Sequence, residues 1–342
     1  MNLDLPERFG QVDPANALGD VEAAWRQWEQ ARALPVPDVP PAGVTVVLVT
    51  GMGGSGTVGD VVAALAADRL PVPVVVHKGY GAPAFAGTDT LAVVVSHSGD
   101  TEETCSALAA AHGRGARVLA VTAGGRVGAY CDDHGVPWVR VPTGAPPRHS
   151  LGWLAMPALV ALGLDGGADE AVALLRELAG QWGRHVPVAA NPAKQAALRL
   201  AGVGLPVVYG AQGLSAVAAR RLENQLNENA KLQACSEVMP ELCHNDIVGW
   251  QSPAPAPAGL VCLRDPAGEH PRVARRFAVL DELVGDRFRW REQVLAHGDG
   301  PLARLLSLLS FVDHVSVYAA LARDVDPTPI PLIDALKRRL TR

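Results

Sequence analysis

The chain alternates apolar runs with glycine-containing turns and helical patterns, and this alternation constrains its fold more than any other feature. The apolar run VTVVLVT at residues 44–50 is followed by the turn GMGGSG and then by the helical pattern VGDVVAALAADRL. A near-continuous apolar run of this length is typical of a strand that is buried on both faces of a parallel sheet. Strand, turn and helix in this order predict an α/β fold with a doubly wound parallel sheet and flanking helices.

Further apolar runs extend this alternation along the chain. A second, shorter series opens much like the first, because LPVVYGAQGLSAVAARRLENQ parallels VVLVTGMGGSGTVGDVVAALA, so we expect two related α/β domains. The first series predicts strands at 44–50, 71–77, 90–96, 116–123 and 136–142, and the second predicts strands at 205–211, 259–265 and 286–292. Helices are expected at 21–33, 151–178, 192–201, 214–232, 301–323 and 332–340, with another beginning at Pro271.

The length of the chain also favours two domains. A chain of 342 residues exceeds what a single core usually organises, and 49% hydrophobic residues suffice to fill two cores. The expected division is an N-terminal helix and Pro-rich linker at 1–40, a first α/β domain at 41–165, linking helices at 166–203, and a second α/β domain with a C-terminal helical tail at 204–342.

Composition narrows the possible partners and the compartment. A net charge of −5 without a basic run argues against nucleic acid, which leaves small molecules or a second copy of the chain. Five cysteines without a CxxC pair fit a reducing compartment, and their spacing matches no zinc pattern, so we expect no metal. No cofactor is expected either. The start MNLDLPERFG is not a secretory signal, and the apolar stretch Leu151–Leu164 is too short to span a bilayer. We therefore expect a cytoplasmic protein without a membrane partner.

The turn GMGGSG formally matches the dinucleotide fingerprint G-x-G-x-x-G, with Gly51, Gly53 and Gly56 in place. That site requires an acidic residue at the end of the next strand to bind a ribose hydroxyl. The next strand ends instead in His77 and Lys78. The motif alone is weak evidence, and a basic, NADP-type site stays open as an alternative.

A second turn, SHSGDTEET at 96–104, favours a phosphate group instead. It follows a predicted strand and begins a helix, where backbone N–H groups have no intrahelical acceptor and anions are stabilised. Together with Ser55 from the first turn, the hydroxyls of Ser96, Ser98 and Thr101 predict an anion pocket for one phosphomonoester at the carboxyl edge of the sheet. The alternative is that these hydroxyls only cap the helices.

The stretch Glu223–Trp250 is the other place where chemistry is expected, because acids, a lone histidine and four asparagines lie there among apolar residues. Its first half predicts a helix that carries Glu228 near the C-terminal end. Its second half is not periodic and contains His244. Glu228 and His244 are 16 residues apart, so they could meet only through a chain reversal or across a subunit boundary. The alternative is a capped surface helix followed by a polar loop.

Five motifs in order, GMGGSGTVGD, SHSGDTEET, PPRHSLG, NENAK and SEVMPELCHNDIVGW, resemble the bifunctional phosphoglucose/phosphomannose isomerases of bacteria and archaea. The paired turns are similar to those of the sugar isomerase (SIS) domain. The resemblance runs from about residue 44 to the tail and implies two SIS domains, a dimer and no metal. It also implies interconversion of glucose 6-phosphate or mannose 6-phosphate with fructose 6-phosphate, as in glycolysis and gluconeogenesis.

The resemblance also implies roles for individual residues. Arg148 of PPRHSLG would lie by the reacting carbons, and Glu228 of NENAK would be the catalytic base. His244 of CHND would open the sugar ring with Lys337 of IDALKRR, and His244 could complete the site of the partner subunit. The phosphate would be bound by Gly54, Ser55, Ser96, Ser98 and Thr101.

Two positions depart from the pattern. His97 and Asp100 stand where the family pattern SYSGNTEE has Tyr and Asn, which affects substrate preference more than the expected chemistry. Two other functions stay open: a phosphosugar-sensing SIS protein without catalysis, and a SIS isomerase for another sugar phosphate. The first predicts binding without turnover, and the second predicts a different preferred substrate.

Overall fold

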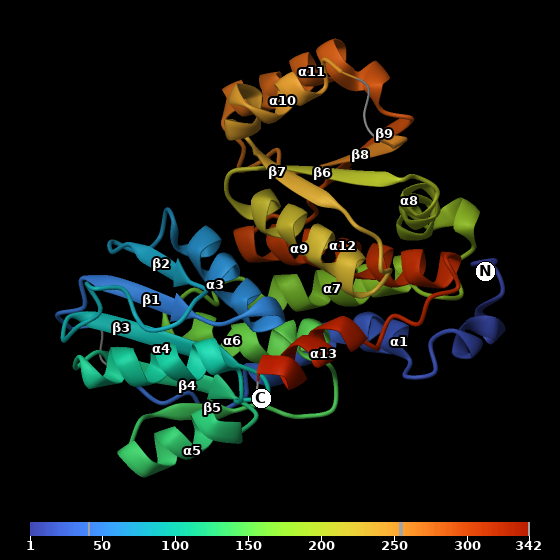
Figure 1. Ribbon diagram of the computed structural model, residues 1–342. Coiled ribbons are helices and arrows are strands. Elements are labelled where there is room, and N and C mark those ends of the chain that lie inside the picture. The colour runs from blue at the N-terminus through green and yellow to red at the C-terminus, as the bar shows by residue number, and fades with distance from the viewer. Residues whose placement is uncertain (40–41, 253–255, 341–342) are drawn as a thin grey trace. The chain divides into compact units, whose positions relative to one another are not determined.

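The computed structural model describes residues 1–39, 42–252 and 256–340 of the chain (Figure 1). Two compact units form, each around one sheet. The first-sheet unit comprises residues 23–176 and 297–307, and the second-sheet unit comprises residues 1–22, 177–296 and those from 308 onward. Both units consist of segments that are separate in sequence. The domain boundaries expected after residues 40, 165 and 203 stay predictions. Residues 40, 41 and 342, which fall at the limits of those segments, lie outside the described residues.

The sheet of the first-sheet unit has five parallel strands in the order β2-β1-β3-β4-β5. All five strands that the apolar runs predict are present. All seven residues of β3 are buried, which explains its continuous apolar sequence. The strands are β1 (Val46–Thr50), β2 (Val74–His77), β3 (Thr90–Ser96), β4 (Arg117–Thr122) and β5 (Trp138–Arg140).

Helices cover both faces of this sheet. Leu48 and Val94 pack with Leu108 and Val127, which lie on the helices that follow β3 and β4. On the other face, Val49 lies close to Gly59 in the helix that follows β1. The helices are α2 (Ala24–Ala31), α3 (Gly53–Ala66), α4 (Glu102–Gly113), α5 (Gly125–His134), α6 (Leu151–Ala161) and the 3-10 turn η2 (Pro147–His149), with α7 (Ala168–Trp182) leading out of the unit.

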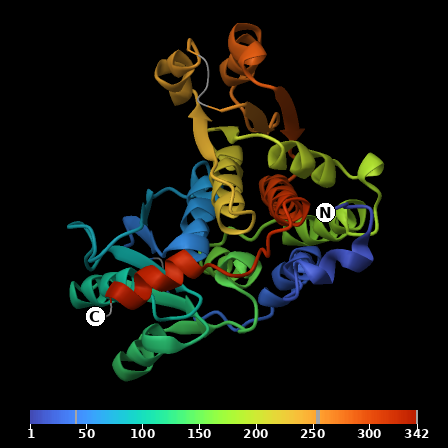
Figure 2. The same cartoon turned by 45° about the vertical axis from the view of Figure 1, so that its right-hand side comes forward.

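The sheet of the second-sheet unit has four parallel strands in the order β7-β6-β8-β9. The sequence interpretation missed β7 because this edge strand alternates exposed and half-buried residues, CSEVM, in place of a continuous apolar run. Figures 1 and 2 both show β7 running from the segment after α9 toward α10. The strands are β6 (Leu205–Ala211), β7 (Cys235–Met239), β8 (Ala258–Arg264) and β9 (Trp290–Leu295).

The core of this unit is built on residues of β6 and β8. Tyr209 and Leu260 pack with Phe277 and Leu280 of the helix after β8. The helices are α1 (Ala17–Glu22), α8 (Pro192–Ala201), α9 (Leu214–Glu228), α10 (Asp246–Gly249), α11 (Pro271–Val284), α12 (Pro301–Ala322) and α13 (Pro331–Leu340). Short 3-10 turns are η1 (Pro6–Gln11), η3 (Val188–Ala190), η4 (Glu241–His244) and η5 (Gly285–Arg287).

Several predicted elements have the wrong bounds. The helix expected at 21–33 is two helices, α1 and α2. The helix expected at 151–178 is interrupted between α6 and α7, where Gly163 and Gly167 take left-handed φ angles of 64° and 86°. The strand expected at 286–292 begins later, as β9, because η5 occupies its first residues.

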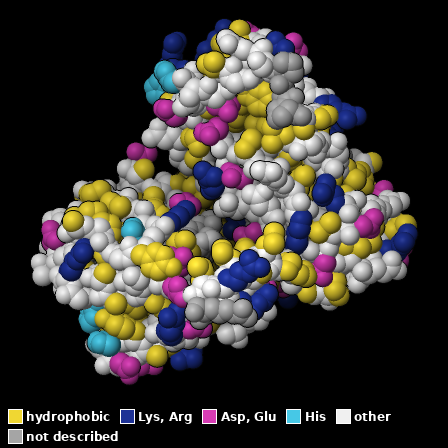
Figure 3. All heavy atoms as spheres, viewed as in Figure 1, with side chains coloured by type: hydrophobic (Ala, Val, Ile, Leu, Met, Phe, Trp, Pro, Cys, Tyr) yellow, Lys and Arg dark blue, Asp and Glu magenta, His cyan; other side chains and the backbone are white. Residues whose placement is uncertain are grey.

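Among the described helices, α12 has the length and composition of a membrane span, with 22 residues and a mean hydropathy of 1.6. Within the protein 83% of its apolar window is buried, as in the core helix of a soluble protein, so the helix is weak evidence for a membrane span. On the face drawn in Figure 3, acidic and basic side chains are interspersed over the surface.

Candidate active site

The predicted phosphate turns lie at the point where the first sheet reverses its winding direction. The chain passes from β1 through α3 to β2 on one side, and β3 lies on the other side of β1. Both turns leave the carboxyl ends of these neighbouring strands, which is where open parallel sheets bind ligands. The sheet topology therefore brings Ser55 and Ser96 to one edge.

The first turn, between β1 and α3, passes very close to neighbouring backbone. A Cβ atom on Gly51 would lie 2.7 Å from the carbonyl oxygen of Val95. One on Gly54 would lie 2.9 Å from the backbone N and Cα atoms of Arg148. The Ser55 hydroxyl accepts a hydrogen bond from the N–H of His97 at 3.1 Å, which ties the first turn to the second. Glycine at 51 and 54 thus permits three chain segments to converge.

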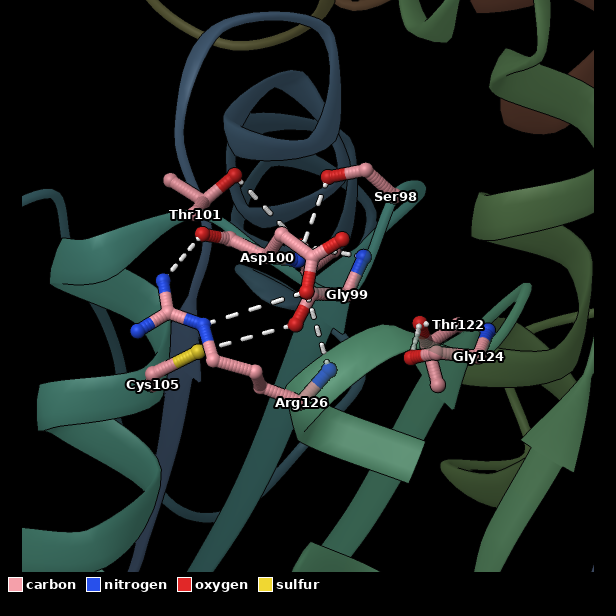
Figure 4. A network of polar contacts seen from close by, with 9 residues as sticks. Ser98, Gly99, Asp100, Thr101, Cys105, Thr122, Gly124 and Arg126 are labelled. Atoms are coloured by element: carbon pink, nitrogen blue, oxygen red, sulfur yellow. Dashed lines mark hydrogen bonds and ion pairs between the residues drawn. The ribbon is translucent and has the colours of Figure 1, made fainter. Parts of the chain in front are cut away.

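The second turn holds its hydroxyls in place by bonds to its own backbone (Figure 4). Ser96 Oγ accepts from the N–H of Gly99 at 3.1 Å, and Ser98 Oγ accepts from the N–H of Asp100 at 3.2 Å. Ser96 Oγ also lies 3.5 Å from Thr101 Oγ1. Ser98 can still donate its O–H group to an anion, and Ser96 can do so in place of its bond to Thr101. This arrangement suits a phosphate dianion.

The helices behind both turns begin without side-chain caps. Within the described residues, Met52 before α3 and Thr101 before α4 make no capping hydrogen bond from their side chains. The first backbone N–H groups of a helix have no intrahelical acceptor, and the positive end of the helix dipole favours an anion there. The interpretation of these hydroxyls as helix caps only is therefore wrong for α3 and α4.

A third loop, between β4 and α5, supports the second turn and was missed in the sequence. Gly99 has a φ angle of 76°, and a Cβ atom on it would lie 1.8 Å from the carbonyl oxygen of Gly124. The N–H of Arg126 donates to Asp100 Oδ1 at 3.0 Å, and its guanidinium bonds the Asp100 carbonyl (Figure 4). The glycine pair at 124–125, directly after a predicted strand, was the available signal.

Arg148 lies beside the first turn in η2 and is buried, with 4% of its surface exposed. Its neighbours fix the segment, because Gln27 Nε2 donates to the carbonyl of His149 at 2.6 Å and Ser150 Oγ donates to the carbonyl of Pro146 at 3.0 Å. A guanidinium stays protonated at all relevant pH values. The first-sheet unit thus holds the backbone of a permanently charged residue beside the first turn.

His97, one of the two departures from the family pattern, is a buried residue of the second turn. Burial lowers the pKa of its imidazole, against the opposing effect of a hydrogen bond with the backbone of Pro142. Its Nε2 atom has no hydrogen-bond partner within the described residues. Burial therefore disfavours protonation of the imidazole, and the backbone N–H of His97 donates to Ser55 Oγ.

Glu228 is the last residue of α9, in the second-sheet unit, so the helix ends before residue 232, where the sequence predicts its end. The helix is held along one face by residues at i, i+4 and i+8. Arg221 makes two bonds to Asp313 on α12, at 2.7 and 2.8 Å, and Gln225 donates to the same carboxylate at 2.8 Å. Asn229 donates to Ser316 Oγ at 2.9 Å. These contacts fix the backbone that carries the Glu228 carboxylate.

His244 lies in η4 and is exposed, after the carboxyl end of β7. Helix α9 must run back along the sheet, because β6 and β7 are parallel, so Glu228 precedes the amino end of β7. The four intervals between the five residues of β7, at about 3.3 Å each, put the ends of the strand roughly 13 Å apart. One chain therefore places Glu228 and His244 at opposite ends of the same strand.

Comparison with known proteins identifies the chain. The family model for the bacterial phospho-glucose isomerase C-terminal SIS domain matches residues 189–340. A bifunctional phosphoglucose/phosphomannose isomerase from Caldicellulosiruptor bescii is 36% identical over 304 residues, covering 86% of this chain and 89% of the relative. The chain belongs to the bifunctional phosphoglucose/phosphomannose isomerase family.

Other relatives agree with this assignment. A bifunctional phosphoglucose/phosphomannose isomerase from Aquifex aeolicus is 32% identical, covering 86% of this chain and 90% of the relative. The solved structure of a glucose-6-phosphate isomerase like protein from Thermus thermophilus has a TM-score of 0.65 with 21% identity and covers 99% of both chains. The expected fold, two SIS-type α/β units with parallel sheets, is thereby confirmed.

The remaining site residue expected from the isomerase family, Lys337, lies on α13. None of the described residues of this helix is buried. The structure thus assembles Gly54, Ser55, Ser96, Ser98, Thr101 and Arg148 in one unit, and it carries Glu228, His244 and Lys337 on separate elements of the other. Within the described residues no group of three or more histidine, cysteine, aspartate or glutamate side chains could hold a metal ion.

Proposed function

We propose that this member of the family interconverts glucose 6-phosphate, mannose 6-phosphate or both with fructose 6-phosphate, without a metal or cofactor, in the cytoplasm. The observation that carries the proposal is the hydroxyl-lined reversal point of the first sheet, where Ser55 and Ser96 converge with uncapped helix N-termini. That chemistry suits a phosphomonoester. Family membership supports a sugar phosphate as the molecule that carries it.

The phosphate binds first in this scheme. The hydroxyls of Ser55, Ser96, Ser98 and Thr101 donate to the phosphate oxygens, and the backbone at Gly54 lets the anion approach the helix N-terminus. Binding energy gained at the phosphate orients the sugar carbons for the chemical step. The phosphate itself takes no part in the reaction.

Proton transfer between neighbouring carbons follows. Glu228 removes the proton from carbon 2 of the open-chain aldose, and the electron pair forms a cis-enediolate with the carbonyl at carbon 1. The proton of the hydroxyl at carbon 2 passes to the oxygen at carbon 1, and Glu228 returns its own proton to carbon 1, which leaves the carbonyl of the ketose at carbon 2. The enediolate carries negative charge on oxygen. The permanently charged Arg148 stabilises it, because a preorganised cation lowers the free energy of the transition state.

Ring opening comes before this step, since hexose phosphates are mostly closed rings. His244 and Lys337 are the acid and base that move the proton from the anomeric hydroxyl to the ring oxygen. We assign His244 to the site of the partner subunit in a homodimer. The separation of Glu228 and His244 along β7 supports this assignment, because one chain does not hold them side by side.

A coupled assay of fructose 6-phosphate formation from glucose 6-phosphate and from mannose 6-phosphate, with EDTA present, tests the activity. We expect turnover of at least one substrate that EDTA leaves unchanged. Binding of either sugar phosphate without turnover would favour a sensing protein instead. Turnover only with another sugar phosphate would favour a sibling isomerase, and inhibition by EDTA would point to a metal.

Mixing two inactive variants tests the shared site. Glu228→Gln and His244→Ala dimers, unfolded and refolded together, should recover about a quarter of wild-type activity if half of the dimers are mixed and each mixed dimer has one intact site. Refolded Glu228→Gln alone is the control. Mixed dimers that stay inactive, with subunit exchange confirmed by mass, would contradict the assignment of His244 to the partner subunit.

A further inference from the structure

The residues around Glu228 hold the end of α9 through their side chains. Asn227 Oδ1 accepts from the N–H of Ala234 at 3.2 Å, and Asn229, which is fully buried, donates to Ser316. Both asparagines of the NENAK motif therefore fix the backbone on either side of Glu228. The lysine of the motif, Lys231, has no role in the proposed reaction.

Lys231 has an unusual backbone conformation. Its φ angle is 49°, in the left-handed region that residues other than glycine seldom adopt. This conformation is energetically unfavourable for a residue with a Cβ atom. The turn it makes brings the N–H of Leu232 back to the carbonyl of Leu226 at 3.1 Å. Glycine would make the same turn at lower cost, and what lysine contributes in its place is a side chain with an ammonium group.

The ammonium group supplies that contribution by donating to backbone carbonyls. Lys231 Nζ lies 2.8 Å from the carbonyl oxygen of Glu228 and 3.0 Å from that of Asp326. Longer contacts reach the carbonyls of Asn229 at 3.4 Å and Pro327 at 3.3 Å. The last carbonyls of a helix have no intrahelical donor and carry partial negative charge, so a cation is stabilised there. One ammonium thus joins the end of α9 to the segment between α12 and α13.

We propose that Lys231 is a positioning residue for Glu228. Its ammonium fixes the peptide carbonyl of Glu228 against the segment at Asp326, so that the carboxylate reaches its target from a fixed backbone. This inference rests on the proposed role of Glu228 as the base. Lys231 acts through the backbone of Glu228 and is assigned no contact with substrate.

Two substitutions separate positioning from stability. Lys231→Met keeps the length of the side chain and removes the donor, and Lys231→Gly removes the donor and the backbone strain together. We expect kcat to fall about 10- to 100-fold in both variants, because a small displacement of a catalytic group costs about that much. KM should stay within about twofold, since the phosphate is bound by other residues. Lys231→Gly should unfold at a higher urea concentration than Lys231→Met while showing the same loss of kcat.

Arg323 offers a matched control. Its Nε atom donates to the carbonyl of Ala230 at 3.2 Å, so Arg323→Met also removes a cationic donor from this turn but leaves the carbonyl of Glu228 untouched. We expect its kcat to stay within about threefold of wild type. Adding propylammonium to Lys231→Gly should raise kcat in a saturable way, which a purely structural loss would not allow.

The outcomes distinguish this inference from the proposed function. If Glu228→Gln retains full kcat, Glu228 is not the base and the proposed function fails. If Glu228→Gln is inactive but Lys231→Met keeps kcat within about threefold of wild type, only the positioning role is overturned. Equal losses of kcat in Arg323→Met and Lys231→Met would also overturn it, because the whole turn, and not this ammonium, would then matter.

Discussion

The two sheets share one winding pattern but use their reversal points in opposite ways. In the first sheet, β1 and β3 end in turns whose hydroxyls face an uncapped helix N-terminus. In the second sheet, β6 and β8 are the neighbouring strands that correspond to β1 and β3. The turn after β8 binds a side-chain carboxylate of the protein itself. Glu269 accepts from the guanidinium of Arg264 at 2.7 and 2.9 Å and from the N–H of Asp265 at 3.0 Å.

The other groups at the second reversal point also bond within the protein. The Ser215 hydroxyl accepts from the N–H of Ala211 at 2.8 Å and lies 3.3 Å from its carbonyl. The imidazole of His270 accepts from the N–H of Arg272 and so caps α11. Identical topology therefore does not make a ligand site. Among the described residues, helix α9 begins without a side-chain cap, as α3 does, so the difference lies at the outer strands, where the N-terminus of α11 is capped and that of α4 is not. Four predictions follow from the comparison.

The largest effect is expected from Glu269→Ala. This carboxylate is 2% exposed and Arg264 is 10% exposed, so removal leaves a buried cation without its partner and should lower the free energy of unfolding by about 3–5 kcal/mol. Urea unfolding measures the loss. If Glu269 stands in for a ligand anion, sodium formate should restore part of this stability, whereas equal ionic strength of sodium chloride should not. Equal effects of both salts would contradict the comparison.

Removing a hydroxyl from the first reversal point should weaken substrate binding. Each of Ser55→Ala and Ser96→Ala loses a hydrogen bond to a charged group, about 1.5–3 kcal/mol, or roughly 10- to 150-fold in kcat/KM. The loss should come mainly through KM. Steady-state assays of the two variants beside Ser215→Ala, the matched hydroxyl of the second sheet, test this. An equal rise of KM in Ser215→Ala would remove the distinction between the two sheets.

The buried His97 should make the first-sheet unit sensitive to acid. The unfolded chain binds a proton on this residue below about pH 6.5, whereas burial lowers the pKa of the folded state. The free energy of unfolding therefore falls as the pH drops below about 6.5, by at most about 1.4 kcal/mol per pH unit, until the folded pKa is passed. His97→Phe should reduce this slope in urea unfolding at a series of pH values.

His314 provides the counterpart in the second-sheet unit, since burial also lowers its pKa. His314→Phe should reduce the acid slope in the same direction. If neither variant changes the slope, the acid sensitivity of the protein comes from other groups.

The smallest effect is expected from Asp100→Asn, which restores the residue of the family pattern. The side-chain oxygen still accepts from the N–H of Arg126, so stability should change by less than about 0.5 kcal/mol. Removing one exposed negative charge beside the phosphate turn should lower KM by at most about threefold, and added salt should erase the difference. An increase in KM would show that the carboxylate itself assists binding.

The sequence predicts much of the first-sheet unit because its strands are continuous apolar runs and its turns carry glycine and serine. Prediction from the sequence fails for a strand that is buried on one face only. The edge strand β7 escapes detection because Cys235 and Glu237 are exposed. Without β7, the opposite positions of Glu228 and His244 could not be inferred. The ion pair between Arg264 and Glu269 could not be predicted either, because nothing in the sequence distinguishes these two charged residues from ordinary surface residues.

The three contacts from Arg221, Gln225 and Asn229 to α12 recur at the period of the helix. Any slide of α9 along its axis would break all three contacts together, so these contacts hold the helix in one position relative to α12. The carboxylate at its end can swivel about its own bonds but cannot travel along the helix axis. Variants selected for larger or smaller sugars should therefore change residues that contact the ligand and leave this register intact.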